Sequence, residues 1–312
     1  MKKHCNKQLD LLVLEITSRC NLKCPLCFRQ EEMKGQNDLP YEDWVNAYNI
    51  YKPKIVSLFG GEPTLRWKEC LKFLDYIYKE NPMPEPVNIH IVTNGSVDVN
   101  WEDIPAEYRK HILVCLGIDG LPESDKVTRG EYHFEKAIKT AAELSRLNIA
   151  FCISTVYTPD FILNNTKSVE EFITYMHTNY TPINIRIHTA LTGRDKIKND
   201  MSKIMTVDDI KAARLIRSLD VVKKYNVEIN ERARMCKSKG VFISSNGGFS
   251  PKCTALRSHT KYGHYTEYTL EDALKIYDYI LSLNFRCEDK DTRKVDKFIE
   301  STRRLRQESR AK

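Results

Sequence analysis

The chain has 312 residues, of which 41% are apolar and 29% are charged, and it carries a formal net charge of +7. That apolar content supports one large core, or one core with a smaller appended module. No apolar run approaches the ~20 residues of a membrane span, and residues 1–12 hold too little apolar sequence for a signal peptide. We therefore expect a soluble, cytoplasmic protein with no membrane partner.

Six short β-branched runs in the first 190 residues alternate with longer segments of 3.6-residue apolar periodicity. This alternation is typical of βα units around a parallel sheet, so the predicted fold class is α/β. The predicted strands are 11–16, 55–59, 88–93, 112–117, 150–156 and 184–188. Ser168 with Glu171 predicts a capping box at the start of the helix that follows the fifth strand.

Beyond this first region, 1–190, a polar stretch at 191–205 predicts a linker, and a second region covers 206–288. It opens with a predicted helix at 206–225. Asn246-Gly247 then predicts a hairpin turn between two short strands. Thr269 and Asp272 predict a capping box that begins a further helix.

The last segment, 289–312, is basic, because residues 290–312 contain nine Lys and Arg against four Asp and Glu. Its less polar residues recur at helical spacing, which predicts an amphipathic helix docked on the body with a solvated basic face. The residues on that stripe are Val295, Phe298, Ile299, Thr302 and Leu305.

Ten cysteines are many for a cytosolic chain, yet they are too unevenly spaced for a small disulfide scaffold, so metal ligation is the first hypothesis. Cys20, Cys24 and Cys27 follow the first predicted strand directly. Three thiolates on one loop leave one iron of a [4Fe-4S] cluster open for a non-protein ligand. The alternative is structural zinc, with Cys20, or His4 and Cys5, completing the Cys24-x2-Cys27 pair.

This CX3CX2C loop resembles that of the radical SAM superfamily, and further matches follow the later strands. Gly60, Gly61 and Glu62 end the second strand and resemble the GGEP motif that receives the amino group of S-adenosylmethionine (SAM). The glycines let backbone approach a ligand closely. The resemblance therefore implies a [4Fe-4S] cluster on Cys20, Cys24 and Cys27, with SAM bound to it.

Other residues resemble the remaining SAM contacts of the family. Thr93 and Asn94 end the third strand, and Asp119 ends the fourth, where Gly117 replaces a serine that is common in the family. Arg129 is suited to the methionine carboxylate as a charge-assisted contact. The contacts predicted for adenine or ribose are Leu26 and Thr155, the latter beside Ser154 and Val156.

Each of these segments lies at the carboxyl end of a predicted strand, where α/β barrels assemble their sites. The resemblance covers about 9–190 and implies a partial (β/α)6 TIM-type barrel. It also implies the chemistry: the reduced cluster cleaves SAM, and a 5′-deoxyadenosyl radical takes a hydrogen atom from the substrate. A flavodoxin or ferredoxin is the expected electron donor.

Cys236, Cys253 and Cys287 resemble the ligands of a shortened SPASM or twitch extension, so 206–288 is predicted to be an α+β module with an auxiliary Fe-S cluster. His259 and His264 are candidates for its fourth ligand. The alternative is a helical cap with scattered thiols.

Three other cysteines, Cys70, Cys115 and Cys152, lie at apolar positions and are predicted to be small buried hydrophobes. Asn184, Arg186 and His188 alternate along the sixth strand, so they share one face. They point either toward a substrate or to polar partners inside the protein.

Three functions fit these features. The first is a radical SAM enzyme acting on a peptide or a small molecule; because the first strand begins about ten residues from Met1, a leader peptide would be recognised elsewhere. The second is modification of RNA or a nucleotide, with Arg303, Arg304 and Arg306 on phosphates. The third is a non-catalytic Fe-S or zinc regulator. The sequence leaves the substrate open.

Overall fold

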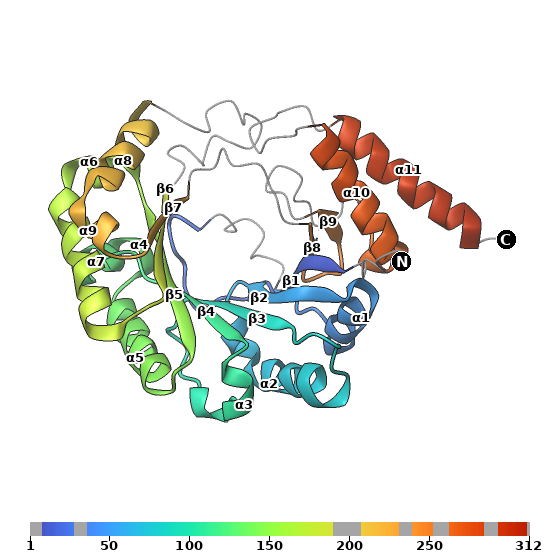
Figure 1. Cartoon of the computed structure of the whole chain (residues 1–312), viewed down its shortest axis with the longest axis horizontal. Helices are drawn as coiled ribbons and strands as arrows, with labels where there is room; N and C mark the ends of the chain where they lie inside the picture. Colours follow the sequence, from blue (N-terminus) through green and yellow to red (C-terminus); the bar gives the residue numbers. More distant parts are fainter. Residues whose placement is uncertain are drawn as a thin grey trace, which may run out of the picture. The chain divides into compact units, whose positions relative to one another are not determined.

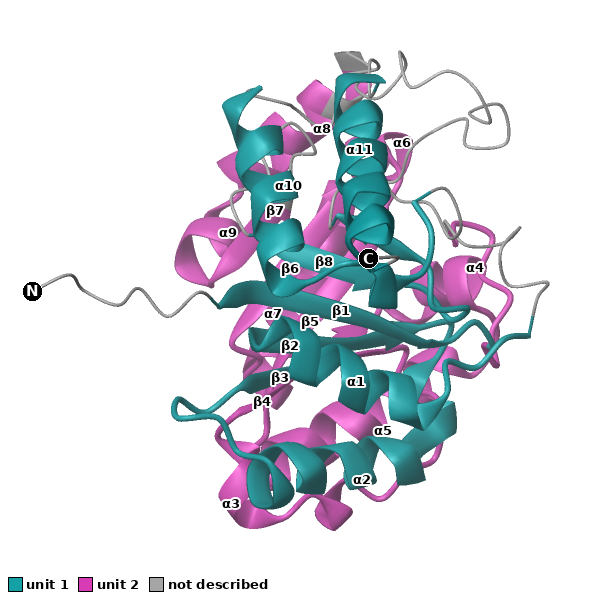
Figure 2. Ribbon diagram, turned by 90° about the vertical axis from the view of Figure 1, so that its right-hand side faces the viewer, with its two compact units in different colours: residues 1–19, 35–90, 233–312 teal, residues 20–34, 91–232 magenta. Residues whose placement is uncertain are grey.

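The computed structural model describes residues 8–27, 36–189, 207–230, 239–251, 262–283 and 293–310. The chain divides into two compact units (Figure 2). Unit 1 comprises Met1–Arg19, Gly35–His90 and Ala233–Lys312, and unit 2 comprises Cys20–Lys34 and Ile91–Arg232.

Strands and helices alternate along the chain in the described residues (Figure 1). The strands are β1 (Leu9–Thr17), β2 (Pro53–Gly60), β3 (Asn88–Thr93), β4 (Ile112–Gly117), β5 (Ala150–Tyr157), β6 (Asn184–Thr189), β7 (Val227–Asn230), β8 (Gly240–Ile243) and β9 (Phe249–Pro251). The α-helices are α1 (Tyr41–Tyr51), α2 (Trp67–Asp75), α3 (Ala106–Arg109), α4 (Pro122–Arg129), α5 (His133–Arg146), α6 (Pro159–Asn164), α7 (Thr166–Tyr180), α8 (Val207–Ser218), α9 (Asp220–Lys224), α10 (Leu270–Ser282) and α11 (Arg293–Arg310). Short 3-10 or π turns are η2 (Pro63–Arg66), η3 (Tyr76–Glu80), η4 (Trp101–Asp103) and η7 (Tyr265–Glu267).

The strand order is β7-β6-β5-β4-β3-β2-β1-β8-β9. The pairs β1–β2, β1–β8, β4–β5, β5–β6 and β6–β7 are parallel, and β8–β9 is antiparallel. This mostly parallel sheet with intervening helices confirms the α/β fold class. The C-terminal α+β module and the division of the chain at 190, 205 and 288 stay predictions.

In unit 1, α1 packs its aromatic stripe against α2. The ring of Phe73 stands edge-on to Trp44 and Tyr48, at centroid distances of 5.7 and 6.1 Å. All three side chains are fully buried. Stacked or edge-on aromatic pairs add to the large apolar area that such residues bury, so this cluster anchors α1 and α2 beside β1 and β2.

In unit 2, α5 and α7 cover one face of the strands (Figure 1). Ala137, Ala141 and Leu144 of α5 are fully buried, as are Phe172 and Met176 of α7. These positions recur every three or four residues, so a single stripe of each helix meets the sheet. The opposite face of the strands carries the polar residues described below.

All six strands predicted from the β-branched runs are present, lengthened by at most a few residues. The Asn246-Gly247 turn joins β8 to β9, with Gly247 at φ +78°, and the Thr269–Asp272 capping box begins α10. The sequence did not predict β7 as a partner of β6, nor β8 as a partner of β1.

Two helix predictions were wrong. The helix expected at 206–225 ends at Ser218 and restarts at Asp220, because Leu219 is extended and the Ser218 hydroxyl donates to the Leu215 carbonyl. The Ser168–Glu171 capping box is absent. The helix α7 already begins at Thr166, one residue after α6, so Ser168 lies inside it.

The helix α11 fits the predicted amphipathic helix, with Val295 and Ile299 buried, although Leu305 is 63% exposed. Among the residues that the structure describes, no helix is both long and apolar enough to cross a membrane.

Candidate active site

The cysteine loop follows β1 and forms the first segment of unit 2. Cys20, Cys24 and Cys27 are each partly exposed. The loop is turned by a hydrogen bond from the Cys27 amide to the Cys24 carbonyl (3.0 Å), and the Leu22 amide donates to Cys20 Sγ (3.4 Å). Leu26 lies in the turn between the second and third cysteines.

Burial raises the pKa of the Cys24 thiol to about 11, although the positive charge of Arg129 opposes this. Cys27 and Cys20 raise it further, as negative neighbours do. Cys24 therefore interacts electrostatically with the two other thiols of the loop and with Arg129, the cation that favours its thiolate form.

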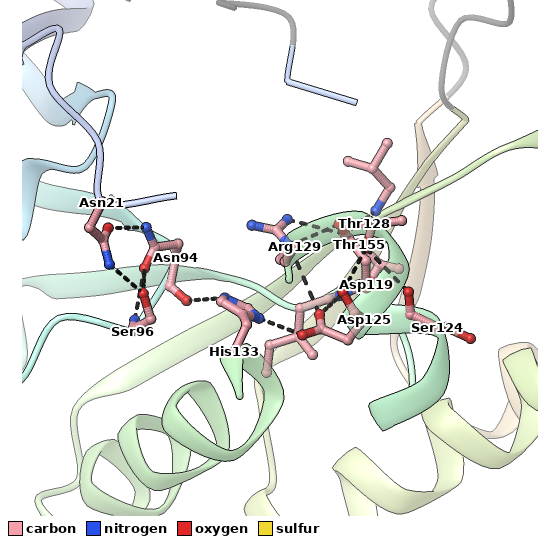
Figure 3. A network of polar contacts seen from close by, with 12 residues as sticks. Asn21, Asn94, Ser96, Asp119, Ser124, Asp125, Thr128, Arg129, His133 and Thr155 are labelled. Carbon is pink, nitrogen blue, oxygen red and sulfur yellow. Dashed lines mark hydrogen bonds and ion pairs between the residues drawn. The ribbon is translucent and has the colours of Figure 1, made fainter. Parts of the chain in front are cut away.

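Asn94, at the end of β3, ties the cysteine loop to the sheet of unit 2 (Figure 3). Its Nδ2 donates to Asn21 Oδ1 (2.9 Å) and makes a long contact with Cys20 Sγ (3.8 Å). Its Oδ1 accepts from Ser96 Oγ (2.6 Å), and Ser96 Oγ also accepts from Asn21 Nδ2 (2.8 Å). The neighbouring Thr93 hydroxyl accepts from the Gly95 amide (2.9 Å), which shapes the turn.

Arg129 and Asp119 form a bidentate ion pair at the start of the next loop. Arg129 Nε and Nη2 donate to the two carboxylate oxygens of Asp119, at 2.8 and 3.1 Å. The side chains are only 14% and 5% exposed. Burial lowers the pKa of Arg129, but Asp119 raises it more, so the guanidinium stays charged. Asp119 is itself fixed by β5, since its Oδ1 accepts from the Val156 amide (2.8 Å).

Gly117 lies directly beneath the guanidinium of Arg129. A Cβ atom at this position would lie 2.7 Å from Nη1 and 2.9 Å from Nη2. Contacts this short do not occur, so a serine here would displace the guanidinium. Gly117 thus lets the Arg129 guanidinium lie directly against the backbone of β4.

His133 is a site residue that the sequence analysis missed. Its Nδ1 lies 2.5 Å from Asp125 Oδ2 and its Nε2 lies 2.8 Å from the Asn94 carbonyl (Figure 3). A carbonyl only accepts, so Nε2 carries a hydrogen. Asp125 also accepts from the Asp119 amide (2.8 Å). His133 and Asp125, both buried, thereby link the end of β3 to α4, which carries Arg129.

Thr155 is fully buried and its hydroxyl donates to the Ile118 carbonyl (2.7 Å). This bond supports the end of β4. Ser154, the neighbour on the opposite face of β5, is the residue that pairs with Gly117. A contact between Thr155 and adenine or ribose stays a prediction, as does that of Leu26.

The residues of the Gly-Gly-Glu motif lie in unit 1. A Cβ at Gly60 would meet the Thr17 carbonyl oxygen at 2.4 Å, and one at Gly61 would meet the Arg19 carbonyl oxygen at 2.1 Å. The glycines therefore let the ends of β1 and β2 approach each other. Glu62 is buried, and one of its carboxylate oxygens accepts from the amide and hydroxyl of Thr64, which caps η2. Their contact with SAM stays a prediction.

The predicted ligands of the auxiliary cluster, Cys236, Cys253 and Cys287, lie outside the described residues, as does His259. The described ranges contain no group of three or more His, Cys, Asp or Glu already gathered as a metal site. His264 lies in the described part of unit 1, where it caps η7. The auxiliary cluster stays a prediction.

A mostly parallel α/β fold, with a cysteine triad after its first strand and an Arg–Asp pair beside it, fits the class of SAM-dependent iron–sulfur enzymes. The family described as the Radical SAM superfamily matches residues 14–176, about half of the chain. The chain belongs to this superfamily, which confirms the resemblance seen in the sequence. Membership implies dependence on SAM and a [4Fe-4S] cluster.

Three known proteins illustrate the similarity. "Uncharacterized protein MJ0907" of Methanocaldococcus jannaschii is 30% identical over 53% of this chain and 57% of its own length. The sporulation killing factor maturation protein SkfB of Bacillus subtilis is 25% identical over 45% of this chain and 34% of its own. Streptococcus suis SuiB, solved with its precursor peptide SuiA, has a TM-score of 0.57 at 18% identity, covering 78% of this chain and 59% of that chain. The chain thus spans less than two thirds of each of these proteins.

Proposed function

We propose that this chain is a radical SAM enzyme that abstracts a hydrogen atom from a peptide, with Cys20, Cys24 and Cys27 holding a [4Fe-4S] cluster. The observation that carries the proposal is the placement of Arg129. Its guanidinium is fixed by Asp119, covers Gly117 and faces Cys24 electrostatically. A cation fixed near the three cysteines can bind the anionic group of a ligand that coordinates the cluster.

The cysteine loop fits a [4Fe-4S] cluster in its donor set. Three thiols on one short loop suit three irons and leave the fourth for another ligand. The Leu22 amide donates to Cys20 Sγ, and amide donors to sulfur are among the contacts that tune such clusters. When bound, the cluster supplies the electron for reductive cleavage of SAM, with flavodoxin or ferredoxin as the proposed source.

Arg129 is proposed to bind the methionine carboxylate of SAM. Asp119 occupies Nε and Nη2, so Nη1 is the nitrogen directed at the space over Gly117. The fixed guanidinium loses little side-chain freedom when the ligand binds, which favours affinity. In unit 1, Gly60, Gly61 and Glu62 are proposed for the amino group of SAM by the family resemblance. Thr93, Asn94, Leu26 and Thr155 complete the proposed set.

A peptide is the substrate class that the relatives favour. SkfB is named as a maturation protein, and SuiB was solved with a precursor peptide. A small molecule is the second candidate, because the chain covers only part of these proteins and need not share their substrates. The identity of the substrate is part of the proposal and depends on the experiment below.

The RNA alternative is weakened by contacts within unit 1. Arg303 pairs with Glu267, Arg306 with Asp272, and Arg304 with Glu308. A phosphate would have to compete with a carboxylate at each of these arginines. The non-catalytic alternative is weakened by membership of the superfamily.

The test is anaerobic reconstitution followed by iron counting and an assay for 5′-deoxyadenosine, with Cys20→Ala, Cys24→Ala and Cys27→Ala as variants. About four irons per cubane are expected. Cys70→Ala is the matched control, because this buried cysteine of α2 is outside the loop. Each loop variant should lose 5′-deoxyadenosine formation, whereas Cys70→Ala should retain it. Retained activity in the loop variants would contradict the proposal. Deuterium transfer from labelled peptides into 5′-deoxyadenosine would then identify the substrate.

A further inference from the structure

Two cysteines that the sequence analysis took for small hydrophobes face each other in unit 2. Cys115 on β4 and Cys152 on β5 are register partners on neighbouring parallel strands. Alternate residues of a strand share a face, so Cys115 lies on the same side as Gly117 and opposite Leu116. Leu116 packs toward Gly95 and α5. The two thiols therefore lie on the polar face of the strands. Cys115 is two residues before Gly117, the residue over which the Arg129 guanidinium lies.

The thiols form part of a chain of polar contacts across four strands. Cys152 hydrogen-bonds to Cys115, and Arg186 Nη1 of β6 lies 4.0 Å from Cys115 Sγ. Arg186 Nε pairs with Glu228 Oε2 of β7 (3.2 Å), and Asn184 Nδ2 donates to Glu228 Oε1 (3.0 Å). Cys115 thus has a thiol donor on one side and a cation on the other.

Cys70 shows what an ordinary buried thiol looks like in this protein. Its sulfur makes a long contact with the Pro63 carbonyl (3.7 Å), and burial raises its pKa. Cys115 is also buried, but the Cys152 hydrogen bond and the charge of Arg186 lower its pKa, while that of Cys152 is raised. Of the two thiols, Cys115 therefore loses its proton more easily, because the Arg186 guanidinium lies 4.0 Å from that sulfur.

We propose that Cys115 and Cys152 are a redox-active dithiol that reacts with small disulfides, with Cys115 as the attacking thiolate and Cys152 as the resolving thiol. Neighbouring strands lie ~4.8 Å apart, within the Cα separation of ~4.4–6.8 Å that a disulfide spans. Cys152 is fully buried and Cys115 is 8% exposed, so we expect a small disulfide to approach Cys115 from the side of Arg186, whose side chain is 29% exposed and lies 4.0 Å from the sulfur.

The exchange balances in two steps. Cys115 thiolate attacks one sulfur of the small disulfide, which breaks its S–S bond and releases one thiolate. Cys152 then gives its proton to the released thiolate and attacks the Cys115 sulfur, releasing the second thiolate and closing a Cys115–Cys152 disulfide. Two electrons pass from the pair to the small disulfide.

The experiment uses the full chain with its reconstituted iron–sulfur content, kept anaerobic in mixtures of hydroxyethyl disulfide and 2-mercaptoethanol. Samples are quenched in acid, alkylated with N-ethylmaleimide and mapped by peptide mass spectrometry. The Cys115 and Cys152 peptides should become linked as the proportion of disulfide rises, while Cys70 stays alkylated. If both cysteines stay alkylated as completely as Cys70 in the most oxidising mixture, the proposal is wrong.

Two variants test the order of attack. In Cys152→Ser, Cys115 should stop at the mixed disulfide with 2-mercaptoethanol, and in Cys115→Ser, Cys152 should stay alkylated. A mixed disulfide on Cys152 in Cys115→Ser would overturn the assignment of the attacking thiol. Cys152→Ala serves as a second form of the first variant, and circular dichroism confirms that each variant is folded.

Arg186→Gln tests the cation. Loss of the neighbouring charge should slow Cys115 modification at neutral pH by about tenfold, and Arg186→Lys should recover part of the rate. The matched control is Arg146→Gln, which removes an exposed arginine of α5 paired with Glu102. An unchanged rate in Arg186→Gln would contradict the role given to Arg186. None of these measurements requires SAM cleavage, so they stand apart from the proposed function.

Discussion

Arginine–carboxylate pairs occur in two regions of this molecule with different consequences. In unit 2, Arg129 and Asp119 are 14% and 5% exposed, and the pair leaves Nη1 of the guanidinium over Gly117. In unit 1, Arg303 and Glu267 are 36% and 18% exposed, and the pair docks α11 on η7. A buried pair is costly to break, whereas an exposed pair contributes little. The same chemistry thus prepares a ligand site in one unit and fastens a helix in the other.

Removing Arg129 should give the largest effect. Arg129→Gln leaves the buried Asp119 charge without its partner, so we expect the free energy of unfolding to fall by about 3 kcal/mol or more. SAM affinity, measured by equilibrium dialysis of the reconstituted protein, should weaken by about 10- to 100-fold, as expected for loss of a charge-assisted contact. The matched control is Arg303→Gln. Equal losses of unfolding free energy and SAM affinity in Arg129→Gln and Arg303→Gln would contradict the difference proposed between the two ion pairs.

His133→Ala should rank second. The variant leaves the Asn94 carbonyl without its donor and Asp125 Oδ2 without its partner, and an unsatisfied buried group costs about 1–3 kcal/mol. Because His133 holds the segments that carry Arg129 and Asn94, SAM affinity should fall with stability. His133→Gln, which keeps one donor, should recover part of both in urea unfolding and dialysis. His111→Ala, in the turn after α3, is the control. A stable variant with unaltered SAM affinity would show that His133 does not position the site.

The third largest effect is expected on SAM affinity in the variants Gly117→Ala and Gly117→Ser. Both side chains displace the Arg129 guanidinium, so we expect SAM affinity to fall by about tenfold. If the serine hydroxyl supplies the contact common in the family, Gly117→Ser should bind SAM more tightly than Gly117→Ala. Dialysis of the two variants side by side distinguishes these results. Wild-type affinity in Gly117→Ala would contradict the proposed position of Arg129.

The smallest expected effect is the pH dependence of the contacts that hold α11 on unit 1. Burial raises the pKa of Glu267, but Arg303 and the hydrogen bonds around it lower it more, so it lies below its ordinary 4.5. Asp272 is lowered likewise below 3.8. A lowered folded pKa stabilises the fold above the unfolded value, and that stability is lost as pH falls through the folded pKa.

Hydrogen exchange of residues 293–310 should therefore show full protection of α11 above about pH 5 and loss of protection toward pH 3. Arg303→Gln should lower the free energy of unfolding at neutral pH by less than about 1 kcal/mol. Protection of α11 that is the same at pH 3 and pH 7 would show that apolar packing alone holds it.

Much of the fold was predictable because its signals are local. Each of the six strands is a β-branched run bounded by turn residues, and the motifs at Asn94 and Asp119 follow strand ends. The sequence even flagged Gly117, although only the structure shows that Arg129 occupies the space. Helix α8 ended early because a serine competed for a carbonyl, which periodicity does not report.

Other residues were missed because their partners are distant in sequence. His133 is a single histidine at the start of an amphipathic helix, and nothing in its spacing points to Asp125 or Asn94. Cys115 and Cys152 looked apolar by position, and only the register of β4 and β5 places them together. Strand patterning placed Arg186 on one face of β6 but did not show that its guanidinium lies 4.0 Å from the Cys115 sulfur.

The contacts of Asn21 bear on the kinetics of cofactor retention. This residue lies between the first two cysteines, and Asn94 and Ser96 hold its side chain by hydrogen bonds at 2.9 and 2.8 Å. A loop tethered in this way has little freedom left to lose on binding, so escape of a bound cluster requires these bonds to open first. Ser96→Ala should therefore speed iron release to a chelator while leaving the number of irons bound unchanged. Equal release rates in Ser96→Ala and the wild type would show that the tether has no such role.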